Sequence, residues 1–329
     1  MEQGKKHMEH PLWMWGAFLG LVLALLALDL GVLNKKDREI GVRESLVLSS
    51  FYIAVSLLFS LWVWHQFGAE SASLYLTGYV VEKALALDNI FVISLVFSYF
   101  AIPRMYQHRV LFWGILGVII LRGIMIGLGT ALITQFAWIL YVFAAFLVYT
   151  GFKMLFMSDD APDISNNFVL KYMKKHFRTT DELYGHDFFV KKEDPKNPGQ
   201  MVWFMTPLFV ALVVIEFVDV IFAVDSVPAI FALTNDPYII YTSNIFAILG
   251  LRSLYFALAA MIHRFEYLKQ ALALVLVFIG GKVFVADLLG LDKVPAPVSL
   301  SITFALILGG VLYSLYKTNQ EEKRKLSNP

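Results

Sequence analysis

Apolar residues gather in nine long intervals, separated by polar connections, along the 329-residue chain. Each interval is at least about as long as the roughly 20 residues that an α-helix needs to cross the hydrocarbon core of a membrane. We therefore predict an all-α, polytopic bundle of about nine transmembrane helices. The intervals cover residues 12–33, 44–67, 74–102, 108–133, 136–157, 201–233, 238–262, 268–289 and 296–316.

The composition agrees with this pattern. Apolar residues make up 58% of the chain and charged residues 16%, whereas soluble domains are about 25% charged. This balance argues against a disordered chain and against a soluble domain. The chain has no cysteine, which excludes disulfides, thiolate metal sites and cysteine catalysis. The net charge of +1 lacks the basic excess that is typical of nucleic-acid binding.

Basic residues in the connections predict the orientation. Alternate connections carry nineteen Lys and Arg, while the remaining connections carry three. Because basic residues in short loops stay on the cytoplasmic side, we place the amino terminus outside and the carboxyl terminus in the cytoplasm.

Three pairs of segments repeat in the same order along the chain. EKALALDN at 82–89 matches DVIFAVDS at 219–226, and VYTGFKMLF at 148–156 matches VFIGGKVFV at 277–285. Between these pairs, ILG occurs twice, followed by Arg122 in one case and by Arg252 in the other. The first segments of the two repeats enter the membrane from opposite sides in the predicted topology. The pattern therefore indicates an inverted repeat, which is common in secondary transporters with a site near the midplane.

These boundaries divide the chain into five parts. We predict a tail with two helices at 1–73, a first three-helix repeat at 74–157, a cytoplasmic loop at 158–200 with at most one short helix, a second, inverted repeat at 201–289, and a last helix with a cytoplasmic tail at 290–329.

Two of the apolar intervals are longer than one crossing requires. Residues 74–102 and 201–233 each contain acidic residues, and the second also contains Pro228. Proline cannot donate a backbone hydrogen bond, and a helix is interrupted at membrane depth only where it lines a cavity or contacts other protein. We therefore expect interrupted helices at the acidic motifs.

Five acidic residues lie within these two intervals. An isolated charge at the bilayer centre costs roughly 2.5 to 3.5 kcal/mol or more, so each acid must face a polar group. Glu216 and Asp219 are three residues apart and share one helix face. The relative placement of Glu82 and Asp88, six residues apart, stays open. The five acids are Glu82, Asp88, Glu216, Asp219 and Asp225.

Five basic residues also lie within predicted helices, and we expect them to pair with the acids. Including Asp29, six acids face these five bases, so at least one carboxylate lacks a basic partner. Such a carboxylate holds a proton until a cation replaces it, which is the minimal chemistry of cation-for-proton exchange. Alternatively, the acids only form hydrogen bonds that pack the helices. The bases are Lys83, Arg122, Lys153, Arg252 and Lys282.

The available ligands indicate which cation such a site prefers. With no cysteine, and with histidines only at helix ends or in loops, the ligands are carboxylate, amide and hydroxyl oxygens, including those of Asn89, Ser226 and Asn244. Oxygen ligands suit Mn²⁺, Mg²⁺ or Ca²⁺ and disfavour Cu⁺ and Zn²⁺. Asn244 has an equally good alternative role as a helix cap. We expect no prosthetic cofactor.

The motifs EKALALDNIF at 82–91, EFVDVIFAVDSVPAIFALT at 216–234 and TSNIFAILGLRSLYF at 242–256 closely resemble the TerC family of integral membrane proteins. The resemblance covers about residues 12–316. It implies a manganese exporter of the bacterial inner membrane. By position in these motifs, it implies metal-binding or proton-coupling roles for Glu82, Asp88, Asn89, Glu216, Asp219, Asp225 and Asn244.

Our leading hypothesis is a secondary exporter of Mn²⁺ that exchanges the ion for protons. One alternative is a membrane scaffold that helps load metal into other enzymes and binds them through residues 158–200; another is an exporter of an amino acid or an oxyanion. We expect no enzymatic activity, because the chain lacks the Gly-x-Gly-Asp context of intramembrane aspartate proteases. The expected partners are the lipid bilayer, Mn²⁺ and protons, and not nucleic acid. The sequence leaves open whether the chain forms a homo-oligomer.

Overall fold

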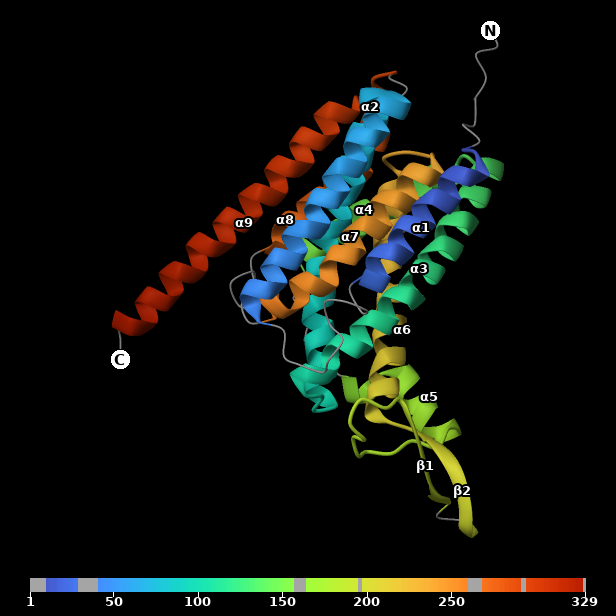
Figure 1. Ribbon diagram of the computed structural model, residues 1–329. Helices are drawn as coiled ribbons and strands as arrows, with labels where there is room; N and C mark the ends of the chain where they lie inside the picture. The colour runs from blue at the N-terminus through green and yellow to red at the C-terminus, as the bar shows by residue number, and fades with distance from the viewer. Residues whose placement is uncertain are drawn as a thin grey trace.

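The computed structural model describes residues 10–28, 41–156, 164–194, 197–259, 268–290 and 294–327. Its helices form an elongated bundle, with a small extramembrane unit at one end (Figure 1). Only the backbone is described for Leu87, Asp88, Asn197, Pro198, Asp225, Arg252 and residues 321–327.

The bundle is an all-α membrane assembly. Six of its helices are long and apolar enough to cross a membrane: α2, α3, α4, α6, α8 and α9. Helix α1 and the apolar part of α7 are shorter. The helix bounds are α1 Leu12–Leu28, α2 Val42–Tyr99, α3 Arg104–Gln135, α4 Ile139–Phe156, α6 Pro207–Phe231, α7 Pro237–Leu258, α8 Leu268–Leu288 and α9 Ala296–Ser327.

Helix α2 folds back on itself at Gly68. This residue has a φ of 87°, a backbone conformation that glycine adopts readily and other residues rarely do. The hydroxyl groups of Ser56 and Tyr75 lie 2.9 Å apart although the residues are 19 positions apart in the sequence. In a straight helix they would be about 28 Å apart. The segments on the two sides of Gly68 therefore lie side by side and run in opposite directions (Figure 1).

Two apolar clusters fill the bundle, one above the other along the helix axes. The first contains Tyr79 of α2 and Ala223 of α6, and the second contains Ala86 of α2 and Ile215 of α6. On both helices an acidic residue, Glu82 or Asp219, falls between the two clusters. A polar layer therefore lies between these two apolar clusters.

Helices α4 and α8 approach each other through small residues in a reciprocal way. A Cβ atom on Gly151 of α4 would lie 2.7 Å from the carbonyl oxygen of Ala273 on α8. A Cβ atom on Gly280 of α8 would lie 2.5 Å from the carbonyl oxygen of Ala144 on α4. As residue numbers rise along α4 the contacted numbers fall along α8, so the two helices are antiparallel. Glycine permits this close backbone approach.

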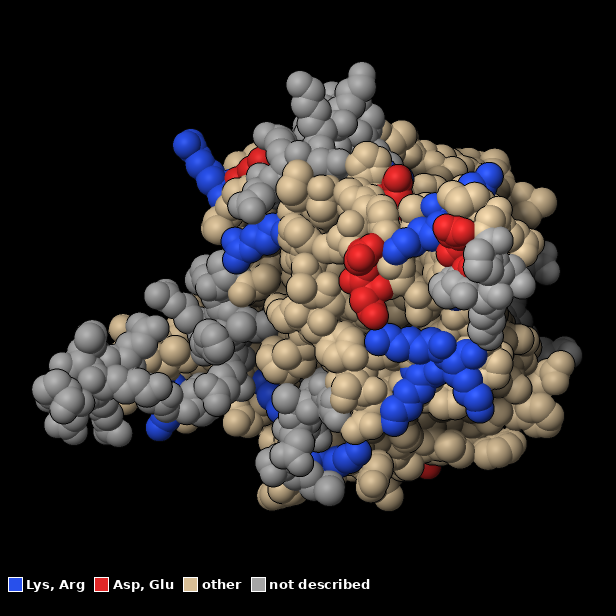
Figure 2. Space-filling view, turned by 90° about the horizontal axis from the view of Figure 1, so that it is seen from below, with Lys and Arg blue, Asp and Glu red and all other residues tan. Residues whose placement is uncertain are grey.

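The extramembrane unit contains more structure than predicted. Besides the 3-10 turn η2 (Ile164–Asn166) and helix α5 (Phe168–His176), it has a two-stranded antiparallel sheet of β1 (Phe189–Asp194) and β2 (Asn197–Met205). The expectation of at most one short helix was therefore wrong. Lys and Arg side chains gather on this end of the molecule (Figure 2).

The strand β2 also shortens the apolar interval predicted at 201–233. Met201 and Trp203 are exposed while Val202 and Phe204 are half-buried, so this segment alternates as a strand does. Helix α6 begins only at Pro207, which suits the first position of a helix because it has no N–H to satisfy. In the sequence, a short alternating strand directly before a long apolar helix looks like one longer apolar interval.

The interruptions expected at the acidic motifs are absent from the described backbone. Within α2 the residue with non-helical angles is Gly68, well before Glu82. Helix α6 is continuous through Asp225 and includes Pro228 in its last turn. The backbone N–H of Ala232 donates to the carbonyl of Pro228 at 2.9 Å, so the helical pattern resumes after the proline. A proline this close to the helix end removes one hydrogen bond without ending the helix there.

Candidate functional site

Six side chains from four helices form a connected network in the polar layer, which we call the polar cluster. The helices are α2, α3, α6 and α7, so both halves of the chain contribute. The members of the polar cluster are Glu82, Asn89, Arg122, Asp219, Ser226 and Asn244.

Arg122 of α3 lies at the centre of this cluster. Its Nη2 atom is 3.0 Å from Oε1 of Glu82, and its Nε atom is 3.6 Å from Oδ2 of Asp219. Its Nη1 atom donates to the hydroxyl of Ser226 at 2.6 Å. The side chain of Arg122 is 1% exposed and that of Glu82 is 2% exposed. Buried charges are normally paired in this way because each would otherwise lack the solvation that water provides.

Two asparagine side chains donate hydrogen bonds to the carboxylate oxygens of Glu82 and Asp219 that do not face Arg122. Nδ2 of Asn89 donates to Oδ1 of Asp219 at 3.2 Å, and Nδ2 of Asn244 donates to Oε2 of Glu82 at 3.0 Å. The amide oxygens of both asparagines are buried without a hydrogen-bond partner among the described residues. Buried amide oxygens normally accept a hydrogen bond or bind a cation, so these two are available as ligands.

The alternative role of Asn244 as a helix cap is wrong. Helix α7 begins at Pro237, and the carboxylate of Asp236 accepts from the backbone N–H groups of Tyr238 and Ile239. Asn244 therefore lies inside the helix, where its side chain is free to reach across to α2. The start at Pro237 agrees with the predicted interval 238–262, and Asp and Pro are both favoured at a helix start.

Glu216 lies one turn before Asp219 on α6, against α3. A Cβ atom on Gly114 would lie 3.1 Å from its Oε1 atom, and one on Gly117 would overlap its carboxylate. Both carboxylate oxygens are buried and have no hydrogen-bond partner among the described residues. The missing side chains of these two glycines leave the notch that the carboxylate occupies.

The predicted basic residues have different surroundings. Arg122 contacts two carboxylates, as described above. Nζ of Lys83 donates to the backbone carbonyl of Ala247 at 3.1 Å. Nζ of Lys282 donates to the hydroxyl of Ser299 of α9 at 3.0 Å, outside the polar cluster. Ion pairing to the acids is therefore shown for Arg122, and neutral oxygens accept from Lys83 and Lys282.

Several predicted residues do not enter this description. Lys153 is exposed in the last turn of α4. The backbones of Asp88, Asp225 and Arg252 lie in α2, α6 and α7, but their side chains are outside the described part of the structure, and Asp29 lies outside it entirely.

Sequence reasoning missed the roles of Gly114 and Gly117. Both lie in the segment whose ILG motif recurs at 248–250, and their spacing of three places them on one helix face. Small residues on one face of a membrane helix allow a neighbour to approach closely, and this signal was present in the sequence.

Among the described side chains, no group of three acidic or histidine residues is arranged to hold a metal ion. The two acids of the polar cluster are instead spread around the guanidinium of Arg122. Carboxylate, amide and hydroxyl oxygens, which this cluster contains, are ligands of the type that hard divalent ions prefer.

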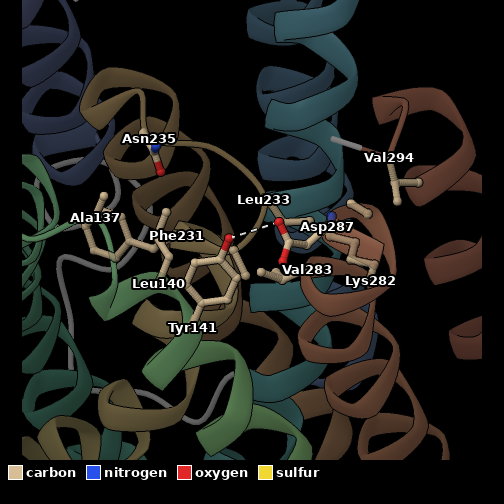
Figure 3. Close-up of a pocket in the computed structure, with 12 residues that line it drawn as sticks. Ala137, Leu140, Tyr141, Phe231, Leu233, Asn235, Lys282, Val283, Asp287 and Val294 are labelled. Atoms are coloured by element: carbon tan, nitrogen blue, oxygen red, sulfur yellow. Dashed lines mark hydrogen bonds between the residues drawn. The ribbon is translucent and has the colours of Figure 1, made fainter. Parts of the chain in front are cut away.

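A cavity of about 250 Å³ is lined by residues that include Tyr141, Phe231 and Asp287 (Figure 3). It lies where α6 ends and α4 and α8 meet, and the hydroxyl of Tyr141 donates to Oδ1 of Asp287 across it at 3.4 Å. None of the six residues of the polar cluster lines it.

Comparisons with known proteins connect this arrangement to a family. Residues 67–322 match the integral membrane protein TerC family. The chain belongs to the TerC family. The match includes every described residue of the polar cluster, and the resemblance seen in the acidic motifs is therefore confirmed.

Relatives extend over almost the whole length of this TerC-family chain. A membrane protein of Rickettsia felis is 48% identical over 93% of the chain and 98% of its own length. A protein of Salmonella typhi with the name Alx, and a suggested role as a membrane-bound redox modulator, is 40% identical over 94% of the chain and 96% of its own length. An Alx protein of Escherichia coli is 39% identical over 95% of the chain and 97% of its own length. No solved structure matches the chain.

Proposed function

We propose that this TerC-family protein is a secondary transporter that exports a divalent cation, Mn²⁺ first of all, in exchange for protons. The observation that carries the proposal is the convergence of Glu82 and Asp219, from the two halves of the chain, on one buried point. Placing ionisable groups inside a membrane is costly, and such groups commonly mark an ion pathway. The buried amide oxygens of Asn89 and Asn244 supply further hard ligands.

An inverted repeat supports the same proposal. In the aligned segments Gly151 corresponds to Gly280, and Ala144 corresponds to Ala273. Each glycine packs against the alanine of the other half, on antiparallel helices. A reciprocal contact of this kind is what a twofold axis between two like elements produces. Glu82 and Asp219 occupy corresponding positions in the matched segments as well, which supports a site shared by the two proposed repeats.

The proposed orientation in the membrane rests on the charge distribution. The basic end that carries the extramembrane unit is cytoplasmic if the protein obeys the positive-inside rule (Figure 2). Helix α1 then begins outside and α9 ends in the cytoplasm. Nine crossings of the inner membrane, an odd number, are consistent with these positions. Rocking of the two repeats about the polar cluster would expose it first to the cytoplasm and then to the outside.

Transport of Mn²⁺ into everted membrane vesicles tests this function. We expect the wild-type protein to take up the ion when the vesicle interior is acidic, and we expect Asp219→Asn to lower the rate at least about tenfold. Asp287→Asn is the matched control, because it changes an exposed carboxylate outside the polar cluster. Equal rates in wild-type, Asp219→Asn and protein-free vesicles would contradict the proposal.

A scaffold for metal loading is the second candidate, and one observation favours it. The strand β2 exposes Met201 and Trp203, which are 61% and 60% exposed and extend beyond the bundle. If this surface only binds another protein, Met201→Ser together with Trp203→Ser would abolish metal loading of that protein and leave vesicle transport unchanged. A redox role for this chain cannot use thiols of its own, because it has no cysteine.

Export of an oxyanion has less support. It would need a cationic side chain that is free to bind the anion inside the bundle. Arg122 forms ion pairs with two acids, which leaves no net positive charge at the polar cluster, while Lys83 and Lys282 donate to neutral oxygens outside it.

A further inference from the structure

The polar cluster already holds a cation, which is the guanidinium of Arg122. This group contacts both acids of the cluster and is 1% exposed. An arginine side chain does not give up its proton in a protein, so its charge is permanent. The cluster is therefore a pair of carboxylates with a built-in counter-ion.

The geometry makes this guanidinium and a metal ion mutually exclusive. Guanidinium nitrogens lie 3.0 Å and 3.6 Å from the carboxylate oxygens of Glu82 and Asp219. A small divalent ion draws oxygen ligands to roughly 2.0 to 2.6 Å, so both acids would have to close on the point that Arg122 now separates. Among the described side chains, no three acidic or histidine groups come together where a metal ion could bind while the guanidinium is in place.

The contacts of Arg122 are of unequal quality. The bond from Nη1 to Ser226 is 2.6 Å long, whereas Nε is 3.6 Å from Asp219 and makes no hydrogen bond. Asp219 is also the more exposed of the two acids, at 16%. The guanidinium can therefore lose Asp219 at little cost and keep its bond to a neutral hydroxyl.

We propose that Arg122 is the resident counter-cation of the empty transporter, and that the substrate ion must displace it from Glu82 and Asp219 in order to bind. The proposal rests on the proposed export of a divalent cation. It assigns Arg122 a second task besides competition: the guanidinium neutralises one of the two carboxylate charges during the return step, so that an exchanged proton need neutralise only the other. Arg122 is thus a positioning residue that couples ion release to the return step.

The test separates ion binding from the return step in purified protein. Binding of Mn²⁺ is followed by loss of the free-ion signal in electron paramagnetic resonance, and transport is followed in proteoliposomes either as net export or as exchange of labelled for unlabelled Mn²⁺ across the membrane. Exchange does not require the empty protein to return, whereas net export does.

For Arg122→Gln we expect Mn²⁺ to bind at least about tenfold more tightly, because the competitor is gone. Exchange of labelled Mn²⁺ should persist, while net export should fall at least about tenfold. Arg122→Lys keeps a charge without the planar fork and should fall between wild type and Arg122→Gln. Arg109→Gln is the matched control, because Arg109 lies on the same helix and stacks on Phe188, 5.5 Å from its ring centre, outside the polar cluster.

Two results would overturn the proposal while leaving the proposed function intact. The first is a folded Arg122→Gln protein that binds Mn²⁺ more weakly than wild type and also loses exchange, and the second is undiminished net export by this variant. If Arg122→Gln does not fold, the single variant Glu82→Gln is compared with the double variant that carries both Glu82→Gln and Arg122→Gln. The proposal fails if the double variant does not bind Mn²⁺ more tightly than the single variant. Wild-type protein that neither binds nor exchanges Mn²⁺ would overturn the proposed function itself and this proposal with it.

Discussion

In both halves of the bundle a side chain from the helix that bears the acids fits against small residues of a neighbouring helix, but one side chain is basic and the other is acidic. In the first half Lys83 of α2 meets α7, where a Cβ atom on Gly250 would lie 2.5 Å from its Nζ atom. In the second half Glu216 of α6 meets α3 at Gly114 and Gly117. The ILG motifs that contain Gly117 and Gly250 correspond in sequence.

This difference shows that two halves can share their backbone packing and still divide the chemistry unequally. Helices α4 and α8 use corresponding glycines for the same close approach, because the backbone alone decides that contact. The notches on α3 and α7 each include the glycine of an ILG motif. A carboxylate with no hydrogen-bond partner among the described residues occupies one notch, and an ammonium that donates to a backbone carbonyl occupies the other. We therefore expect variants at corresponding positions to behave alike in stability and differently in transport.

The largest effect on stability is expected where the halves are alike. Gly151→Val and Gly280→Val each force side-chain atoms onto a backbone carbonyl of the other helix, and overpacking of this kind costs about 1 to 3 kcal/mol. Gly281→Val is the control, because no atom lies within 4 Å of a Cβ there. Thermal unfolding in detergent measures all three. A large loss at one glycine and none at the other would show that the contact is not reciprocal.

A large effect on transport is expected where the halves differ. Glu216→Gln removes the carboxylate that lies unpartnered beside the polar cluster, and we expect Mn²⁺ transport in everted vesicles to fall at least about tenfold. Lys83→Gln can still donate a hydrogen bond toward Ala247 and should retain most of the rate. Equal losses in the two variants would show that the notches have equivalent roles.

A smaller effect is expected from filling the notches. Gly117→Ala pushes the Glu216 carboxylate aside, and Gly250→Ala pushes aside only the flexible end of Lys83. We expect transport to fall a few-fold for Gly117→Ala and to change less for Gly250→Ala, since one factor of three corresponds to less than about 1 kcal/mol. Gly127→Ala on α3 has open space and serves as the control. A larger loss of transport for Gly250→Ala than for Gly117→Ala would contradict the greater role in transport that we assign to Glu216 than to Lys83.

Much of the fold could be predicted from local patterns. Each apolar interval of the sequence contains a helical segment, because hydropathy over 20 residues is a property of the segment itself. The sheet of β1 and β2 was missed, since five alternating residues before Thr206 merge with the apolar helix that follows. The predicted helix breaks were wrong for a related reason: Pro228 disturbs one hydrogen bond near the end of α6 and does not end the helix there.

The candidate site was predictable in its members and less so in its contacts. Glu82, Asn89, Asp219 and Asn244 were singled out because a polar group inside an apolar interval is costly and needs a partner. Which partner each group has could not be read from the chain. Arg122 meets Ser226 from 104 residues away, and Asn244 meets Glu82 from 162 residues away.

By itself the sequence determined that this is a helical membrane protein of the TerC family with acids stranded in both halves of an apolar chain, because burial cost depends on residue type and on neighbours in the same segment. Only the tertiary structure decided that Glu82 and Asp219 share one arginine, that Glu216 lies in a glycine notch, and that Lys83 bonds to a carbonyl. These outcomes depend on which helix faces meet, and helix packing is set by side-chain shapes along the whole interface.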